Sequence, residues 1–148
     1  MNYSNIEQIC REYGITNYTI NPDGTVDVDD DVELSFEKLT RLPLKFRKVS
    51  GGFYCDNNQL TTLEGCPTEV GGHFNCDNNQ LTTLEGCPTE VGGYFSCQTN
   101  QLTKLEGCPT SVGGGFYCSR NPLPEEIIDN PKAFLKQLNR DKIINGLI

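Results

Sequence analysis

The chain has 148 residues, 36% of them hydrophobic, and a formal net charge of −8 at pH 7. This length suits a single domain spanning 1–148, and the negative charge argues against binding to nucleic acid, whose phosphates it would repel. The chain contains no apolar run as long as a membrane span, and residues 1–14 lack the basic start and apolar stretch of a secretory signal. We therefore expect a cytoplasmic protein without nucleic-acid or membrane partners.

Residues 1–28 predict a cap made of a helix and a hairpin. Ser4 and Glu7 have the spacing of a helix capping box, and Gly14 is suited to end the helix. Two short alternating runs then flank Asn-Pro-Asp-Gly at 21–24, which is typical of a β-hairpin. Such a cap would shield the first unit of a repeat structure from water.

From residue 29 to residue 124 we expect units of 21 residues. The segment DNNQLTTLEGCPTEVGG stands at 56–72 and again at 77–93, and a third copy, QTNQLTKLEGCPTSVGG, stands at 98–114. A more divergent unit precedes them, because its leucines lie 21 residues before those of the next unit. A fixed period near 20 residues is typical of a solenoid, in which each unit buries its apolar side against the next.

The unit resembles that of the leucine-rich repeat family. In GHFNCDNNQL, Phe74 and Cys76 take inward strand positions and Asn79 takes the place of the family's asparagine. The unit departs from the family by having serine or glycine at the first consensus leucine. Its short period is most similar to the bacterial-effector subtype, and LTTLEGCPTEVGG is similar to repeats in uncharacterised proteins of large bacteriophages. The resemblance implies a short β-solenoid (leucine-rich repeat) with a parallel sheet on the concave side.

The residue pattern of one unit agrees with that fold. Alternation in HFNCDN predicts a strand from which His73, Asn75 and Asp77 point outward. The asparagine after it can donate and accept, so we expect it to satisfy backbone groups of its own and the next coil. Glycine pairs such as 71–72 predict a tight bend entering each strand. LEGCPTEV has no helical period, so the convex side should be extended or 3₁₀, with few or no helices.

Residues 125–148 lose the period and predict a helical C-terminal cap. Pro131 follows Asn130, which is typical of a helix start, and Phe134 and Leu135 then fall on one side. That apolar side would cover the last coil.

The eight cysteines predict neither disulfides nor a metal site. Seven of them recur every 21 residues, as expected for a small buried side chain repeated along a stack of reduced coils. There is no Cys-x-x-Cys, and His73 is the only histidine, so zinc is disfavoured. Asp27, Asp29 and Asp31 match the first ligands of a calcium loop, but Val32 stands where that loop needs glycine. We predict no metal and no cofactor.

The outward strand positions change most between units that are otherwise nearly identical. Tyr54, Tyr94 and Tyr117 would act as aromatic anchors, because tyrosine is common at binding hot spots. Acidic residues gather toward the first units, which favours a protein partner with a basic or mixed surface. Neutral drift after duplication is the alternative. The predicted partner-binding residues are Asp31, Glu33, Tyr54, Asp56, His73, Asn75, Asp77, Tyr94, Ser96, Gln98, Tyr117 and Arg120.

The sequence contains no catalytic motif. It has no G-x-S-x-G and no phosphate-binding glycine loop, and His73 should face the opposite side of the sheet from the cysteines. We therefore predict a non-enzymatic protein–protein interaction module. In its most specific form it is a phage-encoded binder or inhibitor of a host protein that uses the concave strand face. The alternative is a structural or self-associating protein, such as a virion-associated part.

Overall fold

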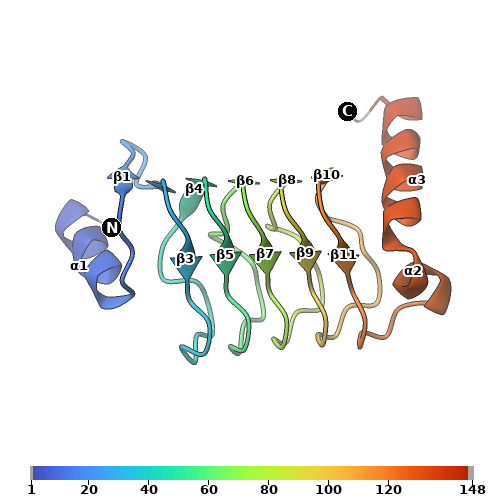
Figure 1. The fold of residues 1–148 in the computed structure, drawn as a ribbon, viewed down its shortest axis with the longest axis horizontal. Helices are drawn as coiled ribbons and strands as arrows, with labels where there is room; N and C mark the ends of the chain where they lie inside the picture. The colour runs from blue at the N-terminus through green and yellow to red at the C-terminus, as the bar shows by residue number, and fades with distance from the viewer. Residues whose placement is uncertain (1, 147–148) are drawn as a thin grey trace.

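The computed structural model describes residues 2–146, which wind into a short β-solenoid (Figure 1). Successive coils are offset by 21 residues, because Phe53 pairs with Phe74 and Phe74 pairs with Phe95 in parallel register. The coils stack along a nearly straight axis, with a helix at the N-terminal end and two helices at the C-terminal end (Figure 1). The predicted fold class is therefore confirmed.

The chain contains three helices and eleven strands within the described residues. The helices are α1 (Tyr3–Glu12), α2 (Glu125–Asp129) and α3 (Pro131–Ile144). One sheet, which we call sheet A, has the order β1 (Tyr18–Ile20), β2 (Val26–Val28), β4 (Phe46–Val49), β6 (Glu69–Val70), β8 (Glu90–Val91), β10 (Ser111–Val112). The other, sheet B, has the order β3 (Val32–Glu33), β5 (Phe53–Tyr54), β7 (Phe74–Asn75), β9 (Phe95–Ser96), β11 (Phe116–Tyr117).

The N-terminal hairpin is part of the solenoid. Strands β1 and β2 pair antiparallel around the Asn-Pro-Asp-Gly turn, as the sequence predicts. Strand β2 then pairs parallel with β4, so the hairpin opens sheet A and β1 forms its edge. The divergent unit is also present, since Val32 of β3 pairs with Phe53 of β5.

Sheet A was not expected as a sheet. The sequence placed LEGCPTEV on an extended or 3₁₀ convex side, yet its last residues, Glu69–Val70 and their equivalents, pair between coils. Each of these strands is two residues long, too short for alternation to identify it. Pairing with the neighbouring coil, which single-unit patterns do not reveal, turns the extended segment into a strand.

In the repeated coils, a corner containing glycine joins the strand of sheet A (β4, β6, β8 or β10) to the next strand of sheet B. A Cβ at Gly71 would collide with the carbonyl oxygen of Ser50 in the preceding coil, and one at Gly92 would collide with that of Gly71. The backbones of consecutive coils therefore approach closely at this corner, which only glycine allows. The predicted tight bend is confirmed.

The core is a set of columns running along the stack. The rings of Phe53, Phe74 and Phe95 are stacked with centroids 5.7 and 5.4 Å apart, and all three are fully buried. Two columns of leucines, represented by Leu81 and Leu84, are fully buried beside them. Burial of each such side chain contributes about 1.5–3 kcal/mol, so most of the folding free energy arises between coils.

The repeated asparagine closes the turn after each strand of sheet B. Asn79 Nδ2 donates to the carbonyl oxygens of Cys76 and Asp77 in its own coil, at 3.1 and 3.2 Å, and to that of Cys55, at 3.0 Å. Its Oδ1 accepts from the backbone N–H of Leu60 at 2.9 Å. The sequence predicted bonds to the next coil. In the structure, the asparagine side chain instead makes its bonds between coils to the preceding coil.

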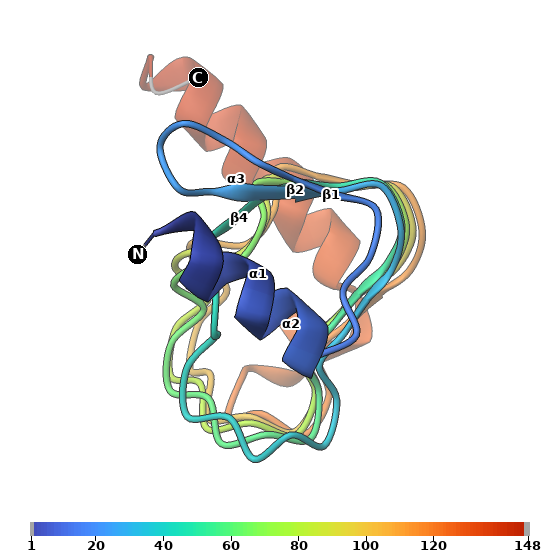
Figure 2. The same cartoon turned by 90° about the vertical axis from the view of Figure 1, so that its left-hand side faces the viewer.

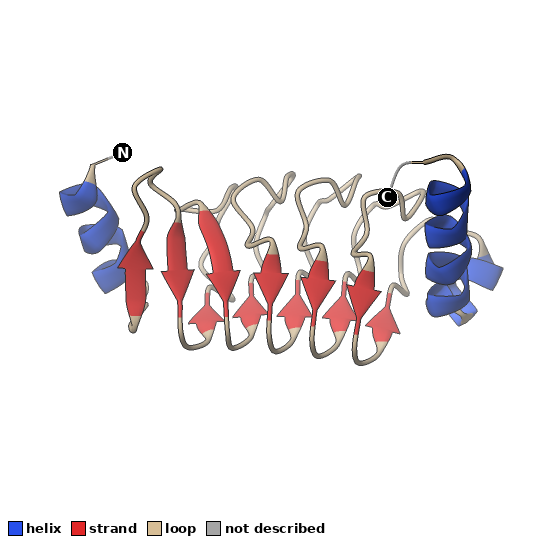
Figure 3. Ribbon diagram, turned by 90° about the horizontal axis from the view of Figure 1, so that it is seen from above, coloured by secondary structure: helices blue, strands red, loops and turns tan. Residues whose placement is uncertain are grey.

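Helices cover both ends of the stack. Figure 2 shows α1 lying across the N-terminal end, where Ile6 and Cys10 are buried. At the other end, Asn139 of α3 donates to the backbone carbonyl of Thr110 at 3.0 Å. The Thr110 hydroxyl makes the equivalent bond to Thr89, so α3 substitutes for a further coil. Figure 3 shows the helices standing at opposite ends of sheet A.

The cap of α1 differs from the predicted one. Asn2 is the N-cap, and its side-chain oxygen accepts from the N–H of Asn5 at 2.9 Å. The predicted capping box was wrong because Ser4 already lies inside the helix. The predicted start of α3 is confirmed, with Asn130 as N-cap and Pro131 as the first residue. No helix within residues 2–146 is long and apolar enough to cross a lipid bilayer.

The turn after each sheet B strand also contains a residue in the left-handed region. Asn78 takes φ 54° there, and Thr99 takes φ 57° at the equivalent position of the next coil. Asparagine tolerates this conformation, whereas a β-branched residue is strained in it. We expect Thr99→Asn to raise the free energy of unfolding by about 0.5–1 kcal/mol, measured by urea denaturation.

The reverse substitution is the matched control for this prediction. Asn78→Thr should lower the free energy of unfolding by a similar amount, because the backbone N–H groups of Asn78 and Thr99 make equivalent bonds to the next coil, both at 3.0 Å. Equal stability of wild type and Thr99→Asn would show that the turn is not strained.

Candidate functional site

The predicted partner-binding residues come together on the outer side of sheet B, which we call the sheet B face. Its central row is set by strand register and consists of Glu33, Tyr54, Asn75, Ser96 and Tyr117. A row on one side contains Asp31, His73 and Tyr94, two residues earlier in their coils, and a row on the other side contains Asp56, Asp77 and Gln98. Arg120 is exposed in the last turn, beyond β11.

Four aromatic rings share one row on this face. His73 and Tyr94 stack with ring centroids 4.0 Å apart and an interplanar angle of 16°, and Tyr94 meets Tyr117 edge-on at 6.1 Å. The Tyr117 ring occupies the space that a side chain at Gly115 would fill, and the Tyr54 ring does the same over Gly52. Rings from two different strand positions therefore lie in one line, which we call the aromatic row: Tyr54, His73, Tyr94 and Tyr117.

Each of the four coils that contain β5, β7, β9 and β11 contributes one ring to the aromatic row. Tyr54 and Tyr117 belong to the central row, and in their coils the residue two places earlier is glycine. Tyr94 instead lies two residues before the central row, and in its coil the central residue is the small Ser96. The sequence identified the tyrosines but missed the row, and the glycine two residues before Tyr54 and Tyr117 is the signal that could have revealed it.

Carboxylates border the first ring of the row. Asp31 Oδ1 accepts from the backbone N–H of Gly52 at 2.7 Å, and Glu33 Oε1 accepts from that of Ser35 at 3.0 Å. Asp56 accepts from the Ser35 hydroxyl at 2.6 Å and from the Asn57 amide at 2.7 Å. All these donors are uncharged. The pKa of Tyr54 is raised by burial and then by Tyr94, with further contributions from Asp31, Glu33 and Asp56.

Within residues 2–146, no lysine, arginine or histidine forms an ion pair with these carboxylates. The ion pairs formed by residues 2–146 join Arg47 to Asp27 and Lys48 to Glu69, and all four side chains lie along sheet A. The part of sheet B that begins the aromatic row therefore presents unpaired negative charge to the solvent.

Asp77 and Ser96 are less available to a partner than the sequence predicted. Asp77 is half-buried, and Ser96 is only 4% exposed. The reason is their mutual hydrogen bond: the Ser96 hydroxyl donates to Asp77 Oδ1 at 2.6 Å, and the Gln98 N–H donates to the same oxygen at 2.7 Å. Ser96 therefore supports the face from within rather than forming part of its surface. Burial raises the pKa of Asp77, although these two hydrogen bonds oppose the increase.

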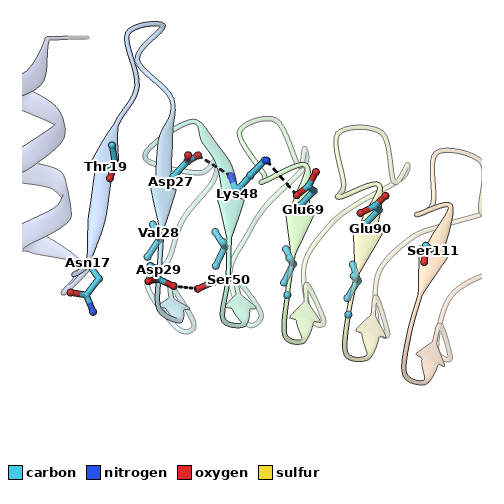
Figure 4. Close-up of a pocket in the computed structure, with 15 residues that line it drawn as sticks. Asn17, Thr19, Asp27, Val28, Asp29, Lys48, Ser50, Glu69, Glu90 and Ser111 are labelled. Atoms are coloured by element: carbon cyan, nitrogen blue, oxygen red, sulfur yellow. Dashed lines mark hydrogen bonds and ion pairs between the residues drawn. The ribbon is translucent and has the colours of Figure 1, made fainter.

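A second surface, which the sequence did not indicate, lies along sheet A (Figure 4). It is an open depression of about 510 Å³ that crosses strands from the hairpin to β10. Lys48, Glu69, Glu90 and Ser111 form its outer row, and Figure 4 shows the contact of Lys48 with Glu69. Its charges are partly paired and it contains no aromatic side chain, so it is a weaker candidate than the sheet B face.

The cysteines lie inside the solenoid. All eight are free thiols and buried. Burial raises the pKa of Cys108 and Cys118 to about 11, and raises that of Cys76 and Cys97 well above the ordinary value, with neighbouring thiols contributing. A neutral, enclosed thiol is a poor nucleophile. His73 is exposed on the sheet B face and its Nδ1 accepts from the N–H of Tyr94 at 2.9 Å, so it is not placed to activate a core thiol.

The aspartates of the disfavoured calcium loop have separate partners. Asp27 pairs with Arg47, Asp29 accepts from the Ser50 hydroxyl at 2.6 Å, and Asp31 accepts from a backbone N–H of the next coil. Within residues 2–146 no cluster of three or more histidine, cysteine or acidic side chains is arranged to hold a metal ion.

The fold and this face define a β-solenoid with 21-residue coils and one exposed aromatic and acidic side. No protein-family model, no curated protein sequence and no solved structure matches the chain.

The buried thiols lead to one prediction. In the folded protein, we expect none of the eight cysteines to react with a disulfide reagent such as DTNB on the timescale of minutes, because the thiolate is disfavoured and enclosed. All should react at once in denaturant. Rapid labelling of a single thiol in the native state would instead reveal an accessible nucleophile.

Asp77 gives a pH-dependent prediction. Because its pKa is raised in the folded state from the ordinary value of 3.8, the charged form lowers stability above the folded pKa, and this loss disappears below the unfolded pKa. Asp77→Asn keeps the acceptor oxygen for Ser96 and Gln98. We expect it to raise the melting temperature at pH 7 and to have no effect near pH 3. A lower melting temperature at pH 7 would mean that the charge itself stabilises the fold.

Proposed function

We propose that this protein is a non-enzymatic protein-binding module of the leucine-rich repeat type and that the sheet B face is its binding surface. The observation that supports this most directly is the aromatic row bordered by unpaired carboxylates. Tyrosine rings on a rigid sheet offer contact area with little entropy to lose, and Tyr117 alone is 49% exposed. Negative charge left without a cation favours a partner with a basic or mixed surface.

The more specific parts of the proposal rest on the sequence. The amino-acid sequence of the repeat is similar to repeats in proteins of large bacteriophages, so we propose a phage-encoded module that acts in the host cytoplasm. There it would act as a binder or an inhibitor of a host protein. The buried state of all eight thiols agrees with a reducing compartment.

The alternative of a structural, self-associating protein has less support. Head-to-tail assembly needs an open end at which a coil of one molecule continues the stack of another. In this chain α1 covers one end, and α3 satisfies a backbone carbonyl of the last coil at the other. Light scattering over a range of concentrations tests this alternative. We expect the protein to be a monomer throughout that range.

Removing the tyrosines of the aromatic row tests the proposed function. We expect Tyr54→Ala, Tyr94→Ala and Tyr117→Ala together to weaken partner binding at least about tenfold, because aromatic anchors account for much of the binding free energy of interfaces. The partner is captured from host lysate on the wild type, identified by mass spectrometry, and its affinity for both forms is then measured with purified proteins.

A triple variant of sheet A is the matched control. Lys48→Ala, Glu69→Ala and Glu90→Ala change exposed strand residues on the other face and should leave the affinity unchanged. Circular dichroism confirms that both variants are folded. Loss of binding in the sheet A variant, with the tyrosine variant unaffected, would move the binding surface to the depression on sheet A.

A further inference from the structure

We propose that Tyr54, Asp31, Glu33 and Asp56 form a binding site for an arginine side chain, and that the partner presents this arginine from an extended, proline-rich segment lying along the aromatic row. This inference rests on the proposed function and names the partner's chemistry.

The four residues converge from two neighbouring coils. Glu33 of β3 is the register partner of Tyr54 in β5. The Tyr54 ring lies over Gly52, whose N–H is held by Asp31, and Asp56 follows two residues after the ring. Asp31 and Glu33 are exposed, while Tyr54 and Asp56 are half-buried. Asp31, Glu33 and Asp56 are all close enough to the Tyr54 hydroxyl to raise its pKa, and their hydrogen bonds use only uncharged donors.

This combination favours a guanidinium over an ammonium group. A planar guanidinium can stack on the tyrosine ring and direct its N–H donors to carboxylates at the ring's margin. An ammonium is a compact, strongly hydrated charge that gains less from a ring. A neutral ligand, such as an uncharged oligosaccharide, could stack on the tyrosines but would leave the carboxylates unpaired.

The spacing of the rings favours a polyproline II segment. Adjacent coils are about 4.8 Å apart, so Tyr54 and Tyr94, two coils apart, are separated by about 10 Å along the stack. Three residues of a polyproline II helix span about 9 Å, so residues three apart in the partner would meet alternate rings. The strands β5, β7 and β9, which lie under the rings from Tyr54 to Tyr94, are already paired with the coils on both sides. The face therefore suits a segment that docks through side chains and needs no strand pairing.

The test uses the whole chain and a fluorescein-labelled peptide of one arginine followed by six prolines, with binding followed by fluorescence anisotropy. Versions with lysine or glutamine in place of the arginine are the comparison. We expect the arginine peptide to bind at least about tenfold more tightly than the glutamine peptide, with lysine between them, and its binding to weaken as salt is added. Equal affinity for the three peptides, or no binding of any, would overturn the proposal.

Charge-removing variants locate the site. Asp31→Asn with Glu33→Gln keeps an oxygen for each backbone N–H, so the fold is preserved, and should weaken the arginine peptide about three- to tenfold without changing the glutamine peptide. Glu69→Gln with Glu90→Gln makes the same change in net charge on sheet A and should have no effect. If both variants lost the same affinity for the arginine peptide, the effect would come from net charge alone and the proposed arginine site would be wrong.

Two outcomes separate this inference from the proposed function. If the tyrosine variant loses a captured protein partner while Asp31→Asn with Glu33→Gln binds it normally, the sheet B face is a binding surface but the arginine site is wrong. If a neutral cello-oligosaccharide competes for the face as well as the arginine peptide does, the aromatic row is a carbohydrate platform and the arginine site is again overturned.

Discussion

The structure depends on hydrogen bonds between consecutive coils. No single coil can satisfy its own backbone, because its strands are only two to four residues long and its turns contain no helix. The strands pair with neighbouring coils, and the asparagine amide makes two bonds within its own turn and two to the preceding coil, as Asn79 shows. An asparagine removed from one coil would therefore leave buried backbone groups unpaired in two.

This dependence explains why the units are so nearly identical inside. A buried apolar side chain meets its equivalent 21 residues away, as Phe74 meets Phe95, and the corner glycines approach the backbone of the preceding coil, as Gly92 approaches Gly71. A change in volume or backbone conformation in one coil would disturb both neighbours. Most outward positions carry less of this constraint, because their side chains reach solvent, although Ser96 is buried against Asp77. They are therefore where chains of this kind can acquire a binding surface at little cost in stability.

The sequence predicted what depends on one unit and missed what depends on two. Inward Phe74, the asparagine turn and the glycine bend follow from local pattern, and the structure confirms them. The second sheet, the direction of the asparagine bonds and the burial of Ser96 depend on which coil lies alongside. The same limit explains the aromatic row, since the return of the Tyr54 ring over Gly52 is a matter of side-chain conformation rather than of spacing.

The aromatic row bears on whether the outward positions drift or are used. Two positions in each coil face outward from the strand. In the first coil they hold Asp31 and Glu33 and no ring, and each of the following four coils holds one ring there. In four consecutive coils the pairs are Gly52 and Tyr54, His73 and Asn75, Tyr94 and Ser96, and Gly115 and Tyr117. The ring changes position within the pair, and in three of these coils its companion is glycine or serine, whereas His73 is accompanied by Asn75. The rings from His73 to Tyr117 still stack or meet edge-on. One ring in each of four consecutive coils supports the proposed use of this face for binding over neutral drift.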